Sequence, residues 1–127
     1  MNKGFRDLIA WQKAYELVLE IYKLSRRFPR HEQYGFTSQI CRAAVSVPGN
    51  IAEGYERQHR REYIRFLIIA KGSLGELETY LLLAQDLGYV NIFECKNIDL
   101  KRKEVAKVLN GLIRSLRAGS WALATGP

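Results

Sequence analysis

The sequence lacks the features that mark several large classes of protein. Its 127 residues contain no apolar run near the roughly 18 residues that a transmembrane helix needs. The only two cysteines, Cys41 and Cys95, form no CxxC pair, so neither a disulfide framework nor a zinc site is expected. The first residues lack the apolar core of a secretory signal. We therefore predict a soluble, cytoplasmic protein whose two thiols are reduced core residues, with no membrane partner.

Groups suited to catalysis or metal binding are also scarce. Only two histidines, His31 and His59, could act as bases or ligands, and neither lies in a triad or a Glu-x-x-His pattern. Residues 72–75 are glycine-rich, but they lie inside a helical repeat and lack the Gly-Lys-Ser of a phosphate-binding loop. We therefore predict no catalytic residue, no metal site, no cofactor and no enzymatic activity.

Apolar residues recur at helical spacing in four segments, and no segment alternates with the period of a β-strand. The pattern predicts helices over residues 5–27 and 33–57, a third helix that Gly88 ends, and a fourth over 91–118. Short loops join them, which favours an all-α, antiparallel, up-and-down four-helix bundle over residues 1–118 and a flexible C-terminal tail over 119–127. The third helix has the most regular apolar repeat: Tyr63, Leu67, Ala70, Leu74, Leu77, Leu81 and Ala84.

Local signals refine the helix boundaries. Pro48 falls inside the second helix, where its ring crowds the carbonyl of Ala44, so a kink or a local break is expected there. Asn91 and Glu94 have the spacing of a capping box, which predicts that the fourth helix starts directly after Asn91.

The third helix has more apolar residues than packing within one small bundle needs. Gly72 and Gly75 each cost about 1 kcal/mol of helix propensity, so they suggest a close helix crossing. We interpret this surplus surface as an oligomer interface. Its residues are Phe66, Ile68, Ile69, Tyr80, Leu82 and Leu83.

Polar residues follow one face of the second helix, from Gln39 to Arg57. One interpretation is a solvated stripe. Another is a buried network that fixes the helix register, because buried polar groups persist only when they are paired. We favour a structural role of either kind over catalysis. The proposed network consists of Asn50, Glu53, Ser73 and Glu76.

The chain is strongly basic, with 20 Lys and Arg against 13 Asp and Glu, a formal net charge of +7 and a pI near 9.6. This balance favours a polyanionic partner, although each cationic cluster could also be a solvated face. Tyr55 and Tyr63 lie near the second cluster and could stack on bases or belong to the core. The three clusters are Lys23, Arg26, Arg27 and Arg30; Arg57, Arg60, Arg61 and Arg65; and Lys101, Arg102, Lys103 and Lys107.

A family resemblance rests on several segments in order. The sequence Ser-Val-Pro-Gly-Asn-Ile-Ala-Glu-Gly at residues 46–54, with residues 5–14 and 72–78, resembles the bacterial four-helix-bundle proteins encoded in intervening sequences of 23S rRNA genes. The resemblance covers residues 5–116. It implies a homopentamer with a basic surface that contacts nucleic acid, and no known enzymatic activity. The fold is also similar to the accessory variability protein of diversity-generating retroelements, a pentameric partner of a reverse transcriptase.

Charge, clusters and resemblance together predict a non-enzymatic nucleic-acid-binding oligomer that holds the phosphate backbone of RNA or DNA through many weak sites. Such a protein could be an accessory factor for RNA or for a reverse-transcriptase complex. The alternative is a structural adaptor whose apolar surfaces bind another protein and whose charge only keeps it soluble.

Overall fold

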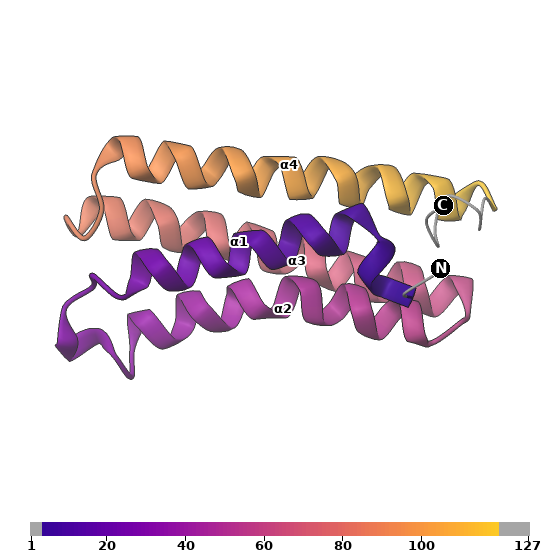
Figure 1. The fold of residues 1–127 in the computed structure, drawn as a ribbon, viewed down its shortest axis with the longest axis horizontal. Coiled ribbons are helices and arrows are strands. Elements are labelled where there is room, and N and C mark those ends of the chain that lie inside the picture. Colours follow the sequence, from indigo (N-terminus) through magenta and orange to yellow (C-terminus); the bar gives the residue numbers. More distant parts are fainter. Residues whose placement is uncertain (1–3, 120–127) are drawn as a thin grey trace.

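The structure, a computed structural model that describes residues 4–119, is a bundle of four antiparallel helices (Figure 1). Each long helix packs against two neighbours, in the cyclic order α1, α2, α3, α4. No strand occurs between residues 4 and 119. The all-α four-helix bundle is thus confirmed, and of the predicted tail only Gly119 is among the described residues. The elements are η1 (Gly4–Asp7), α1 (Ile9–Ser25), η2 (Arg30–Glu32), α2 (Phe36–Glu56), α3 (Arg60–Asp86) and α4 (Ile92–Arg117).

The core follows the apolar repeats. All seven residues of the α3 repeat are buried, from Tyr63 to Ala84, and they meet the inner faces of the other helices. Cys95 is buried and Cys41 half-buried, and both are free thiols. The burial of one face per helix explains why the apolar spacing predicted the bundle.

Two helix ends follow their predicted caps. The Asn91 side chain accepts a hydrogen bond from Glu94 N at 2.8 Å, and Glu94 accepts one from Asn91 N at 3.2 Å, which confirms the capping box. Gly88 has φ of +78°, as expected for a left-handed residue after α3.

The first helix starts later than predicted. Residues 4–7 form the 3-10 segment η1, and Leu8 is extended, so α1 begins at Ile9. The Phe5 ring packs against Trp11, with centroids 5.3 Å apart, and Gln12 Nε2 donates to the Arg6 carbonyl at 2.7 Å. These contacts fold η1 back onto the bundle.

Of the kink or local break expected at Pro48, the break does not occur, because α2 runs unbroken from Phe36 to Glu56. A proline removes one backbone hydrogen bond, which tertiary packing can offset. Val47, Pro48 and Ile51 are all buried against the neighbouring helices. Packing on both sides of the proline therefore holds the helix together.

Candidate nucleic-acid interface

The second cationic cluster lies where α2 turns into α3. Arg57 caps α2, Gln58 turns the chain with φ of 52°, and His59 is extended. Arg60 and Arg61 then open the first turn of α3. This break places Arg57 on a different helix from Arg60 and Arg61.

The C-terminus of α4 lies at the same end of the bundle (Figure 1). The Arg60 guanidinium lies against Gly119, where a Cβ atom would be only 3.2 Å from Nη1. The last turn of α4 adds Arg114 and Arg117, which the sequence clusters did not include. Short loops between antiparallel helices were the signal that these ends would meet. We call the following six residues the arginine end: Arg57, Arg60, Arg61, Arg65, Arg114 and Arg117.

Two residues of the arginine end are held by contacts within the protein. Both Arg57 and Arg65 lie over the Phe66 ring, with their guanidinium carbons 5.0 Å and 4.9 Å from its centroid. Arg57 also pairs with Glu53 at 3.2 Å, and Arg65 pairs with Glu62 at 3.1 Å. These contacts orient both side chains and partly compensate their charges.

Arg60 and Arg61 are the exposed and uncompensated members of the arginine end that belong to α3. Within residues 4–119 neither forms an ion pair. They stand on the first turn of α3, whose N-cap residue, His59, makes no side-chain capping bond. Guanidinium groups beside free backbone N–H groups form an arrangement that can bind a phosphate.

The third cluster separates into buried and exposed residues. The prediction that Arg102 binds nucleic acid is wrong, because its side chain is only 9% exposed. Arg102 pairs with Asp99 at 2.6 Å and with Glu78 at 3.3 Å, between α3 and α4. Its position in the apolar repeat of α4, between Ile98 and Val105, was the signal for burial. Lys103 pairs with the same Asp99 at 3.5 Å, whereas Lys107 is exposed.

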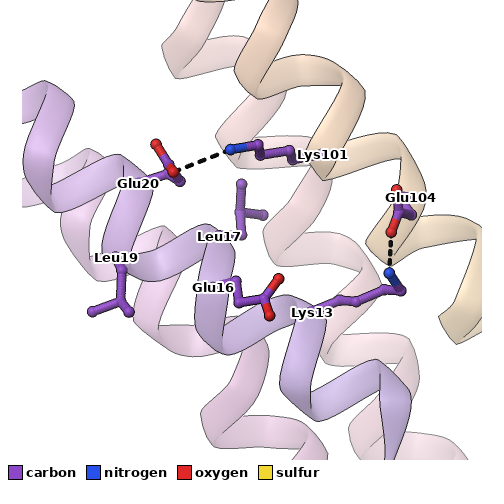
Figure 2. A pocket seen from close by; sticks show the side chains of 7 residues that line it. All are labelled: Lys13, Glu16, Leu17, Leu19, Glu20, Lys101 and Glu104. Atoms are coloured by element: carbon purple, nitrogen blue, oxygen red, sulfur yellow. Dashed lines mark hydrogen bonds and ion pairs between the residues drawn. The ribbon is translucent and has the colours of Figure 1, made fainter.

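A groove of about 350 Å³ follows the seam between α1 and α4 (Figure 2). Lys101 reaches across it to Glu20 at 3.1 Å, and Lys13 pairs with Glu104. The hydrogen bond from Lys13 lowers the pKa of Glu104, and the same bond raises the pKa of Lys13. The ammonium groups of this groove are thus matched by carboxylates on the facing helix.

The first cluster lies at the opposite end of the bundle, in the last turn of α1 and the segment that follows it. Arg27 pairs with Glu94 of α4, while Arg26 and Arg30 are exposed. The three clusters therefore do not merge into one surface. Only the second gains further arginines, from α4.

The tyrosines near the second cluster do not form a stacking platform. Tyr63 is 1% exposed and packs edge-on against Tyr55, with centroids 6.0 Å apart. Burial raises the pKa of Tyr63 above its usual range. Of the two alternatives that the sequence left open for Tyr63, the structure therefore supports the core and not stacking on bases.

A hydrogen-bonded polar network does join α2 to α3. Ser46 Oγ and Ser73 Oγ are 2.7 Å apart, and Ser73 Oγ donates to the Ile69 carbonyl at 3.3 Å. Asn50 Nδ2 donates to the Ser46 carbonyl at 2.7 Å and to its hydroxyl at 2.9 Å. This arrangement supports the predicted structural role of Asn50 and Ser73.

The predicted roles of Glu53 and Glu76 in that network are wrong. Glu53 is 52% exposed at its side chain and pairs with Arg57, and Glu76 is also exposed. Glu53 follows Asn50 by three residues, and Glu76 follows Ser73 by three residues. Such a step turns a helix by about 300°, which moves both carboxylates out of the narrow seam between α2 and α3.

Other candidate chemistry is limited in the described part of the chain. His31 and His59 are both exposed, and no group of three potential metal ligands occurs in residues 4–119. No helix between these residues is long and apolar enough to cross a membrane.

Comparison with known proteins shows similarity to a protein family and to solved structures. The profile of a family described as 23S rRNA-intervening sequence protein matches residues 6–111. A crystal structure from Bacteroides thetaiotaomicron VPI-5482, of a protein of unknown function from the S23 ribosomal protein family, is 26% identical with a TM-score of 0.78. That match covers 85% of this chain and 97% of the other. No curated protein matches the sequence.

Proposed function

The chain belongs to the 23S rRNA-intervening sequence protein family, and from this premise we propose that it is a non-enzymatic oligomer that binds the backbone of nucleic acids. The family description links such proteins to rRNA, which supports RNA as a partner, with DNA as a second. In this proposal the protein acts as an accessory factor for RNA or for a reverse-transcriptase complex. The arginine end is the observation that carries the proposal.

The arginine end suits phosphate better than a specific base. Arg60 and Arg61 offer planar guanidinium groups that bind phosphate through two hydrogen bonds each. Tyr63 is buried and gives no stacking surface beside them. Contacts to the backbone carry little sequence information, so binding depends on charge and salt rather than on sequence.

Self-association is the second part of the proposal. Ile68 and Leu82 of α3 are about half exposed, and apart from the adjoining residues and backbone of α3 itself nothing lies within 4 Å of where a Cβ atom would stand at Gly72 or Gly75. Within the described part of the chain, no helix makes the close crossing that these glycines suggested. A second copy of the protein would supply it, and the family resemblance gives five copies.

An oligomer strengthens a weak backbone site. After one site binds, the others meet the same strand at a high effective concentration, so avidity exceeds the affinity of one protomer. A ring of arginine ends therefore holds a polyanion without a base-specific pocket.

The double substitution Arg60→Ala with Arg61→Ala tests this function. We expect weaker binding to RNA and to DNA, equally across sequences, and a log-log salt slope flatter by about 0.7 to 0.9 for each phosphate that the variant no longer binds. Arg26→Ala with Arg30→Ala is the comparison variant, which removes the same charge from the first cluster at the opposite end, and an equal loss there would show that binding is not specific to the arginine end. The fold is retained because exposed charges contribute little to stability. Unchanged affinity and salt slope would show that the arginine end is a solvated face.

The structural adaptor is the second candidate, favoured by the exposed apolar residues of α3. It predicts no salt-dependent binding to any nucleic acid. Titration of the wild-type protein with mixed RNA and DNA at several salt concentrations separates the two functions.

A further inference from the structure

The helix α4 has an excess of positive charge on its outer face. It contains seven cationic residues and three carboxylates. Each of the three carboxylates has a partner at the side of the helix, and two of them, Asp99 and Glu104, also act on Lys103 and Lys107 of the outer face. The pairs are Glu94 with Arg27, Asp99 with Arg102, and Glu104 with Lys13.

Four of the cations form a straight row. At about 100° per residue, Lys96, Lys103, Lys107 and Arg114 point within about 40° of one another, and they span about 27 Å along the helix. All four are exposed. Lys103 is 3.5 Å from Asp99, and Lys107 lies in the field of Glu104, whereas Lys96 and Arg114 form no ion pair within residues 4–119. We call these four residues the α4 cation row.

Two large apolar side chains share this outer face. Phe93 is 78% exposed and Leu100 is 65% exposed, and they follow the helical spacing of the row. An aromatic ring beside a line of cations is typical of surfaces that bind single strands, where bases stack and phosphates meet cations. A paired duplex hides its base faces and would leave Phe93 unused.

The row leads into the arginine end. Arg114 belongs to both, and Arg117 follows it in the last turn of α4. The Arg60 guanidinium then lies against Gly119, directly after α4. A strand that follows the row from Phe93 therefore reaches the uncompensated arginines of α3.

We propose that a single-stranded nucleic acid lies lengthwise along α4, with its phosphates on the α4 cation row and one base stacked on Phe93. This inference rests on the proposed function and assigns it a path and a strand type. A second copy of the chain carries a net charge of +7 itself, so it complements the α4 cation row less well than a polyanion does. Self-association therefore uses the apolar face of α3 instead.

Fluorescence anisotropy with a labelled single-stranded RNA of mixed sequence, and with the duplex of the same length, tests the path. We expect Lys96→Gln with Lys107→Gln to flatten the single-strand salt slope by about 0.7 for each phosphate that the variant no longer binds. The control is Arg42→Gln, which removes an exposed charge from α2, outside the three clusters and the row, and leaves the slope unchanged.

The stacking step has its own variants. We expect Phe93→Ala to weaken single-strand binding by roughly tenfold and to leave duplex binding unchanged, with recovery in Phe93→Trp. An equal fall in single-strand and duplex affinity in Phe93→Ala would overturn the stacking assignment. A change in oligomer mass in Phe93→Ala would identify this face as an interface and also overturn it.

Two outcomes separate the path along α4 from the proposed function. If the row variants bind as the wild type does while Arg60→Ala with Arg61→Ala loses binding, the path along α4 is wrong and the function stands. If the wild type binds no nucleic acid in any salt condition, the proposed function is itself refuted, and the path with it.

Discussion

Asn50 uses both of its amide hydrogens on Ser46, one on the carbonyl and one on the hydroxyl. Ser73 donates its own hydrogen to the Ile69 carbonyl, so the Ser46 hydroxyl donates to Ser73. Each of these side-chain hydrogens has one acceptor, and the hydrogen-bond network crosses from α2 to α3. The network is therefore satisfied without a carboxylate, which explains why Glu53 stays outside it.

We predict that Asn50→Ala lowers the free energy of unfolding by about 1 kcal/mol. The substitution removes the two hydrogen bonds that Asn50 donates to Ser46 in a half-buried seam. Denaturant melts measure the change. Glu53→Ala is the matched control on the same helix, and its exposed side chain gives a change within about 0.5 kcal/mol. A larger loss in Glu53→Ala than in Asn50→Ala would contradict the structure.

The loop between α1 and α2 contacts the loop between α3 and α4 at the end of the bundle opposite the arginine end. Tyr89, after α3, donates its hydroxyl hydrogen to Glu32 Oε2 of η2 at 2.7 Å. The other oxygen of Glu32 accepts from Phe36 N at 3.4 Å and so helps to cap α2. One carboxylate thus ties two loops and one helix start together.

This tie gives the bundle a predicted pH dependence. The Tyr89 hydrogen bond lowers the pKa of Glu32, so its stabilising effect is present above the unfolded pKa of about 4.3 and is lost as pH falls through the folded value. In Tyr89→Phe the carboxylate loses that bond. We expect a lower stability at neutral pH and a smaller loss between neutral and acidic pH, measured by denaturant melts at several pH values.

The same bond acts in the opposite sense on Tyr89. Its pKa is raised, with the hydrogen bond to Glu32 as the largest cause, so this contribution is present below the unfolded tyrosine pKa of about 10 and fades as pH rises further. Identical pH profiles for the wild type and Tyr89→Phe would show that the bond contributes nothing to stability in solution.

The whole protomer exposes apolar side chains on the outer side of α3, beside two glycines with open space around them. Ile68, Leu82 and Leu83 are each more than 40% exposed. Nothing within the described bundle needs Gly72 or Gly75 to be glycine. This surface explains why assembly belongs to the proposed function.

We predict that the wild type is a homopentamer and that Gly72→Leu dissociates it, because the added side chain blocks a close approach of two helices. Light scattering on a sizing column measures the mass. Gly49→Leu is the control, since Gly49 is equally open but lies on α2. A monodisperse wild-type monomer at micromolar concentration would contradict this prediction and remove the multivalent part of the function.

Helical periodicity predicted much of this protein because it depends on local geometry. The spacing of Tyr63, Leu67 and Ala70 indicated the buried face of α3, and Asn91 with Glu94 indicated the start of α4. The same periodicity, applied to cations as well as to apolar residues, would have found the row that contains Lys96 and Arg114. Arg102 shows the limit of clustering by sequence alone, because neighbours along a helix point to different sides.

By itself the sequence determined the four helices, the all-α class, the positive charge and the family, because these follow from residue type and spacing along the chain. Only the tertiary structure decided that Arg102 pairs with Glu78, that Glu53 is exposed and that α4 contributes Arg114 to the arginine end. Whether a charge is free depends on which helix faces it across the bundle. That partner lies tens of residues away in the chain and is set by packing.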